Sequence, residues 1–292
     1  MTERESITSE VMVAMPRAAI IESMVTDRVA QPVGRLLKEW RMRRRLSQLE
    51  LALEAETSPR HLSFIETGRS TPSREMLLRL AERLDVPLRE RNTLLVAAGY
   101  APRFPERRLD DGELAAAQRV VELVLKGHEP FPALAVDRHW NLVARNDAVP
   151  PLLVGVDPAL LEPPVNVLKL SLHPNGLAPR IVNLAEWREH LLDRLRKQIE
   201  ATADSVLAAL LAELESYPAP SAAGHESTIS KYGGIAVPLR LAVDGGELAF
   251  YSTTTVFGTP LDVTLSELAI EAFFPADERT AAALASNLSR VR

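Results

Sequence analysis

Hydrophobic residues between positions 33 and 99 recur at intervals of three and four, in short blocks separated by residues that cap helices. This spacing gathers the apolar side chains of each block on one face of an α-helix. The first block contains Val33, Leu36, Leu37 and Trp40, and the fourth contains Met76, Leu77, Leu80 and Leu84. The pattern predicts an all-α domain of five short helices that share one core.

Capping residues indicate where these helices begin and end. Ser47 and Glu50 are spaced as a capping box, in which each side chain binds the exposed backbone N–H of the other residue. Ser58 is an N-cap candidate, and Pro59 follows at the first helical position, where a missing N–H costs nothing. Gly68 tolerates the left-handed conformation that often follows a helix. We therefore expect a second helix from Ser47 and a third from Ser58 to about Gly68.

The pattern changes after residue 112. A helix is predicted over 113–126, and the residues on either side of 137–139 alternate between apolar and polar, as paired strands do. The further predicted elements are a helix ending near 172, a helix pair over 183–215, a hairpin turning at 244–246, a strand near 268–274 and a C-terminal helix. Helices and strands mixed in this order predict an α+β domain.

Composition suggests the boundaries between these parts. Residues 1–32 show weak patterning, and we expect a flexible arm there. The helical domain takes 33–100, a linker rich in proline and charge takes 101–112, and the α+β domain takes 113–292. The chain has no cysteine, no basic and apolar leader, and no apolar run of the roughly 18–20 residues that span a bilayer. These features predict a cytoplasmic protein without disulfides that does not enter a membrane.

Charge is divided between the two predicted domains. Residues 28–108 hold 16 Arg and 1 Lys against 10 acidic side chains, a net charge of +7. The remaining residues hold 17 basic against 29 acidic side chains, a net charge of −12. A basic domain joined to an acidic one suggests that only the first faces an anion, although chance clustering of charge is the alternative.

The segment LSQLELALEAETSPRHLSFIETGRSTPS lies at the centre of the five predicted helices. It resembles the helix-turn-helix of the Cro/C1-type repressors, the XRE family, over roughly residues 33–98. The matching positions are Ser47, Gln48, Leu51, Ala52, Ser58, Leu62, Ile65, Glu66, Gly68, Pro72 and Ser73. The resemblance implies that the helix after Ser58 lies in the major groove of double-stranded DNA, with its first residues at the base edges.

By the same resemblance, eight residues are expected to contact DNA: Gln48, Ser58, Pro59, Arg60, Ser63, Phe64, Arg69 and Arg74. Arg60 is the strongest candidate for reading sequence, because a guanidinium can bind guanine O6 and N7 together. Phe64 or Pro59 can touch a thymine methyl group. Arg69 and Arg74 are expected at phosphates, which set register rather than sequence. The alternative is an ordinary solvated basic face.

Two acidic residues test this interpretation. A helix that enters a groove lined with phosphate should avoid acids, yet this one ends on Glu66. The resemblance implies a salt bridge between Glu66 and Arg41 that holds the acid away from phosphate. Glu56 occupies the turn where the family often has glycine. If Glu56 must adopt a positive φ, the turn loses about 1 kcal/mol relative to glycine.

The C-terminal half also has a resemblance, carried by HEPFPALAVDRHWNLVARNDA, PVNVLKLSLHPNGLAPRIVN and the dipeptide EW. These segments look like the ligand-binding domain of MmyB-like regulators, a PAS-like fold, over roughly residues 110–280. The resemblance implies a sensor or dimerisation domain with a small-molecule pocket, and it does not name the ligand.

A PAS-like sheet covered by helices can enclose an apolar cavity with a few polar groups. The candidates for an apolar lining are Trp140, Leu142, Leu168, Leu172, Trp187, Leu191, Phe250 and Tyr251. The candidates for a polar end are Asn146, His173, Arg180 and Asn183. Because few of these candidates are charged, they favour a lipophilic ligand such as a fatty acid. Arg180 or His173 would bind the carboxylate of such a ligand. Ordinary core packing and turn capping explain the same residues without a ligand.

Three functions compete. The leading hypothesis is a homodimeric transcription regulator whose operator binding responds to a small lipophilic effector. The alternative keeps DNA binding and gives the C-terminal domain only dimerisation or docking of a protein partner. An enzyme is the least favoured, because the chain has no nucleophile elbow, phosphate-binding glycine loop or paired metal ligands, and we expect no cofactor.

Overall fold

A computed structural model describes residues 32–109, 111–218 and 236–291 of the chain. Nearly all of the predicted arm at residues 1–32 therefore lies outside the described residues. The chain divides into two compact units between Pro105 and Glu106, inside the predicted linker. Among the described residues, no helix is both long enough and apolar enough to cross a lipid bilayer.

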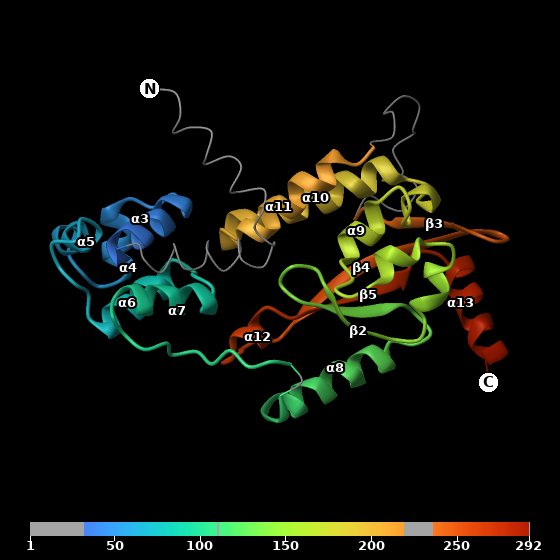
Figure 1. Ribbon diagram of the computed structural model, residues 1–292, viewed down its shortest axis with the longest axis horizontal. Helices are drawn as coiled ribbons and strands as arrows, with labels where there is room; N and C mark the ends of the chain where they lie inside the picture. The colour runs from blue at the N-terminus through green and yellow to red at the C-terminus, as the bar shows by residue number, and fades with distance from the viewer. Residues whose placement is uncertain (1–31, 110, 219–235, 292) are drawn as a thin grey trace, which may run out of the picture. The chain divides into compact units, whose positions relative to one another are not determined.

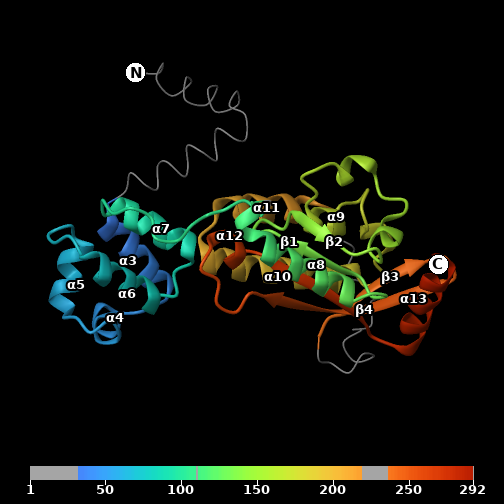
Figure 2. The same ribbon diagram turned by 90° about the horizontal axis from the view of Figure 1, so that it is seen from below.

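Residues 32–105, the described part of the N-terminal unit, form the predicted bundle of five helices (Figure 2). Its helices are α3 (Val33–Arg43), α4 (Gln48–Glu54), α5 (Pro59–Glu66), α6 (Arg74–Arg83) and α7 (Leu88–Ala97). Their inward faces carry the aliphatic side chains that the spacing predicted, and Leu37, Leu51 and Leu62 are fully buried. Removal of such side chains from water supplies most of the driving force for folding a unit of this size.

The predicted caps are present. Ser47 Oγ accepts from the Glu50 backbone N–H at 3.2 Å, and Glu50 Oε2 accepts from the Ser47 N–H at 2.7 Å. Ser58 Oγ accepts from the His61 N–H at 3.1 Å, with Pro59 at the first position of α5. Glu56, in the turn between α4 and α5, has a φ of 52°, so the turn requires the left-handed conformation that glycine adopts at lower cost.

The second unit is built on one antiparallel sheet. Its strands are β1 (Ala133–Val136), β2 (Leu142–Arg145), β3 (Leu239–Val243), β4 (Gly246–Val256) and β5 (Ala269–Pro275). Their order across the sheet is β2-β1-β5-β4-β3. The last strand of the chain therefore lies in the middle, paired with β1 on one side and β4 on the other.

Helices cover both faces of this sheet (Figure 1). The helices α9 (Val167–Leu172), α10 (Leu184–Thr202) and α11 (Ser205–Ser216) lie on one face, and α8 (Ala115–Gly127) lies on the other. The short helix α12 (Val263–Ser266) and the longer helix α13 (Glu278–Val291) flank β5 in the chain. Alternation along the strands separates two cores, because Leu134 and Phe250 face α10 while Ala135 and Ile270 face α8. This arrangement confirms the predicted α+β class.

Candidate functional site

The first candidate surface is the start of α5. Ser58, Pro59 and Arg60 are exposed there, and Ser63 and Phe64 are half-buried one turn further on. Leu62 and Ile65, on the opposite side of the helix, are fully buried. The start of the helix is thus exposed on one side, and the buried apolar residues on the opposite side anchor it in the core.

Phe64 brings two guanidinium groups together on that face. The Arg60 guanidinium carbon lies 5.4 Å from the centre of the Phe64 ring, and that of Arg69 lies 5.9 Å from it. Cations over an aromatic face are held by the ring's quadrupole. Arg69 and Arg74 are both exposed after the helix. Positive charge is therefore concentrated where the sequence placed base and phosphate contacts.

Glu66 takes no part in this surface. Arg41 Nε and Nη2 donate to Glu66 Oε1 and Oε2 at 2.6 and 2.9 Å, so the predicted salt bridge is present. Its hydrogen bond to Glu66 raises the pKa of the Arg41 guanidinium. Gln48 Nε2 also donates to Glu66, at 2.8 Å, which the sequence did not predict. An amide carries two N–H donors, so Gln48 can hold Glu66 and still reach a phosphate.

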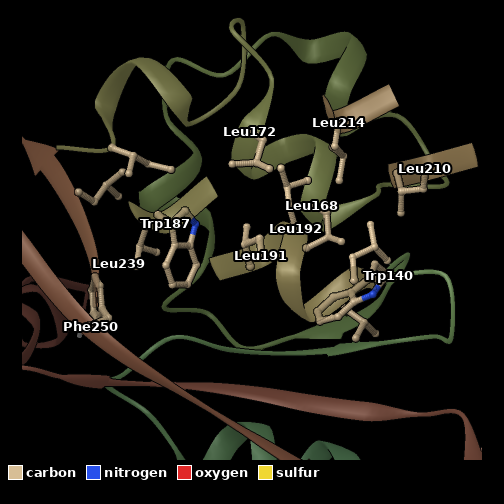
Figure 3. Packing of buried hydrophobic residues seen from close by; sticks show 14 of the residues in the cluster. Trp140, Leu168, Leu172, Trp187, Leu191, Leu192, Leu210, Leu214, Leu239 and Phe250 are labelled. Carbon is tan, nitrogen blue, oxygen red and sulfur yellow. The ribbon is translucent and has the colours of Figure 1, made fainter. Parts of the chain in front are cut away.

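The second candidate site is a cavity of about 110 Å³ between the sheet and helices α9 and α10. Six of the predicted lining residues do line it: Trp140, Leu142, Leu168, Trp187, Leu191 and Phe250. In Figure 3 the indoles of Trp140 and Trp187 stand on either side of Leu191. Both indole N–H groups are already bonded, to Gln198 Oε1 at 2.8 Å and to Ser171 Oγ at 3.0 Å respectively. The rings therefore present apolar surface to the cavity.

The two asparagines predicted at the polar end have structural roles instead. Asn146 donates to the carbonyl oxygens of Leu125 and Phe131 and accepts from the Ala133 N–H. Asn183 donates to the Pro238 carbonyl and accepts from the Arg240 N–H. Both side chains are buried and satisfied by backbone groups, and neither lines the cavity. The structure therefore does not bring these two predicted residues to this cavity.

The remaining predicted residues also lie away from the cavity. His173 Nδ1 accepts from the Asn175 N–H, which closes a turn. Arg180 Nη1 donates to the carbonyl oxygens of Leu152 and Val154 at 3.0 and 2.8 Å. Tyr251 follows Phe250 in β4 and so points to the other face of the sheet. Leu172 is buried in the surrounding core without lining the space, so the structure brings none of these four predicted residues to the cavity.

The polar groups that do reach the cavity are Arg194, Glu271, Ser171 and Ser252. Arg194 Nη1 and Nη2 donate to the two carboxylate oxygens of Glu271 at 3.1 and 2.5 Å. The Arg194 guanidinium carbon also lies 4.6 Å from the centre of a ring of Trp140. Sequence reasoning missed this pair, because its members are 77 residues apart in the chain.

Trp140 occupies an unusual backbone conformation for a bulky residue. Its φ is 67°, in the left-handed region. A tight turn holds it there, since Asp137 Oδ1 accepts from the backbone N–H groups of both His139 and Asn141. Strain of this kind gathers at binding sites, where the surrounding structure imposes it. Among the described residues, no three His, Asp or Glu side chains are placed to hold a metal ion.

Each of the two units matches a known protein family. Residues 117–286 match the family described as the MmyB-like transcription regulator ligand binding domain, and residues 37–91 match the helix-turn-helix family. The HTH-type transcriptional regulator RghRB of Bacillus subtilis (strain 168) is 31% identical over 119 residues, which are 40% of this chain and 83% of RghRB. The structure of an RNA-binding light-oxygen-voltage receptor aligns with 99% of this chain and 69% of its own, at 14% identity and a TM-score of 0.23, too low to indicate a shared fold.

Proposed function

This chain belongs to the transcription regulators that join a helix-turn-helix to an MmyB-like ligand-binding domain, and from that premise we propose a ligand-responsive operator-binding homodimer. That it is a DNA-binding transcriptional regulator follows from the family. The operator contacts, the nature of the ligand and the homodimer are our proposals. A regulator of this kind would act in the cytoplasm, where its operator lies.

The exposed start of α5 supports the proposed DNA contacts. Arg60 would bind a guanine, Pro59 or Phe64 would contact a thymine methyl group, and Ser63 lies on the same outward face. The sequence resemblance puts Gln48, Ser58, Arg69 and Arg74 at the phosphate backbone. Two such helices in a dimer would meet half-sites about one helical turn of DNA apart.

The cavity is the observation that supports a ligand. Two indoles and several leucines form its wall, so an apolar body is the part of a ligand that it would recognise. An apolar protein cavity of about 150 Å³ binds benzene. The cavity of about 110 Å³ suits a small lipophilic molecule. A long alkyl chain such as that of a fatty acid would fit only if the lining residues moved apart.

Salt dependence tests the DNA half of the proposal. Each phosphate that the chain neutralises releases counterions, so binding should weaken steeply as salt rises. Fluorescence anisotropy of a labelled duplex, titrated with the full chain at several salt concentrations, measures this slope. A flat response would contradict phosphate contacts by Arg69 and Arg74.

An exposed apolar row on α8 favours the alternative, in which the second unit only dimerises or docks a protein. Val120, Leu123 and Val124 are 47%, 65% and 40% exposed on one side of that helix. Native mass spectrometry of chain purified without added ligand separates the two functions. A co-purifying small molecule supports the sensor, and a ligand-free dimer that binds no small apolar compound supports the alternative.

A further inference from the structure

The charge balance at the cavity's polar end narrows the class of ligand. Glu271 is buried, with 5% of its side chain exposed, and it comes from the central strand β5. Arg194 reaches it from α10 and is 29% exposed. The pair is bidentate, so among the described residues that line the cavity the one cation is already neutralised by the one anion.

Two neighbours fix this pair in place. Thr254 Oγ1 accepts from Arg194 Nη2 at 2.7 Å and donates to Glu271 Oε1 at 2.9 Å. Trp140 holds the Arg194 guanidinium against its indole. Because Phe250, Ser252 and Thr254 alternate along β4, they share the face of the sheet that lines the cavity. The Arg194–Glu271 pair is therefore a fixed part of the cavity wall.

A carboxylate has two ways to bind here, and both are unfavourable. Beside Glu271 it would place two negative charges on one guanidinium in apolar surroundings. In place of Glu271 it would leave a buried carboxylate without its partner, which is strongly destabilising. A fatty-acid anion would meet one of these costs.

An uncharged polar group meets neither cost. The hydrogen bonds to Glu271 and Thr254 take three of the five N–H donors of the Arg194 guanidinium, so a ligand oxygen can accept another. Ser171 Oγ accepts from Trp187, which leaves its own O–H as a donor toward the cavity. We propose that the ligand of this cavity carries an uncharged polar group, such as an alcohol or an amide, on an apolar body. This inference rests on the proposed ligand-binding function and narrows its ligand class.

The test compares two probes that differ in charge and little else. Hexanamide and hexanoate have the same carbon chain and a planar head group of the same size, and at neutral pH only hexanoate is charged. Isothermal titration calorimetry of the full chain, with shorter and longer homologues of both, measures their affinities. We expect the wild-type chain to bind the amide at least about tenfold more tightly than the carboxylate.

A charge-removing variant sharpens the comparison. Glu271→Gln keeps the shape of the pair and leaves Arg194 with a net positive charge beside the cavity, so this variant should bind hexanoate more tightly than hexanamide. The matched control is Glu247→Gln, because Arg240 and Glu247 form a bidentate pair of the same kind that does not line the cavity. That control should keep the wild-type preference for the amide.

The outcomes separate this inference from the proposed function. If wild type binds hexanoate as tightly as hexanamide, or more tightly, the cavity binds ligands and the inference is overturned. If no amide or acid of the series binds, the ligand-binding function fails and the inference fails with it. Circular dichroism would show whether Glu271→Gln folds. If it does not fold, the relative affinities of the wild-type chain for hexanamide and hexanoate still test the inference.

Discussion

Arg41 and Glu66 form a buried bidentate salt bridge that fixes α5 against α3. The Glu66 side chain is 1% exposed, so the Arg41 guanidinium rather than water compensates its negative charge. Replacement of Glu66 by Ala should lower the free energy of unfolding by roughly 3 kcal/mol, because it leaves the Arg41 guanidinium without its anion. Urea denaturation of the full chain measures the loss.

The exposed pair Arg35–Glu39 on α3 provides the control. Its side chains are 66% and 44% exposed, so Glu39→Ala should change the stability little. If Glu66→Ala and Glu39→Ala lower the free energy of unfolding equally, burial does not make the Arg41–Glu66 bridge more stabilising than an exposed pair.

Gly34 determines how closely α3 approaches the end of α5. A Cβ atom at this position would lie 2.1 Å from the Ile65 carbonyl oxygen, a backbone atom that cannot rotate away. Gly34→Ala should therefore cost about 1–3 kcal/mol, by forcing the two helices apart. Gly127→Ala at the exposed end of α8, where no atom lies within 4 Å, should be neutral or slightly stabilising. Thermal unfolding of both variants checks the contrast.

Arg60 and Arg69 should affect DNA binding in different ways. Arg60→Ala should cost about 1–3 kcal/mol on a selected operator and relax the choice of one base, because it removes a base contact. Arg69→Gln should weaken binding to all sequences and lower the salt slope by about 0.9, the contribution of one phosphate. Anisotropy titrations on selected and random duplexes measure both effects.

Arg119 is an exposed arginine on α8 in the other unit and is not among the residues proposed to contact DNA, so Arg119→Gln makes the same charge change as a control. It should alter neither the affinity nor the slope. Should it act like Arg69→Gln, the effect would reflect net charge rather than a phosphate contact.

Asp204 links stability to pH. Burial would raise the pKa of Asp204, but the hydrogen bond from His139 and the charge of Arg138 outweigh it and lower the pKa to about 2. The stabilisation is therefore complete above the unfolded value near 3.9 and is lost as the pH falls toward about 2. Asp204→Asn keeps the N-cap of α11 and should cost about 1–2 kcal/mol at neutral pH, with the difference shrinking in acid.

Chemical denaturation at a series of pH values tests this. Asp157→Asn is the matched control, because Asp157 caps a short helix through the Ala159 N–H in the same way. The loss in Asp204→Asn is compared with that in Asp157→Asn at each pH. A constant difference between wild type and Asp204→Asn down to acid pH would contradict the role of the Asp204 charge.

Local signals account for what the sequence predicted well. The caps at Ser47 and Ser58 and the spacing of the leucines depend on residues within one or two helical turns, so the chain displays them directly. The Arg41–Glu66 bridge spans 25 residues and came only from the family resemblance. The aromatic and aliphatic lining of the cavity was found because buried strands and helices carry such residues.

Long-range pairing explains what the sequence did not predict. The central place of β5 in the sheet brings Glu271 to Arg194 across 77 positions, and no local pattern marks either residue. Asn146 and Asn183 looked like ligand groups because polar residues among apolar ones suggest a site. The structure shows that they satisfy buried backbone groups, a need that depends on the tertiary fold.

In the proposed function, a ligand in the cavity changes the affinity of the chain for DNA. The most direct test measures binding of the full chain to a duplex selected from a random pool, with and without saturating hexanamide. Coupling is reciprocal, so DNA should change the hexanamide affinity by the same factor, of about fivefold or more. Ser252→Phe, which places a ring in the cavity, should abolish both changes. We expect equal, non-zero coupling in the two directions, and an operator affinity unaffected by bound hexanamide would contradict a ligand-responsive regulator.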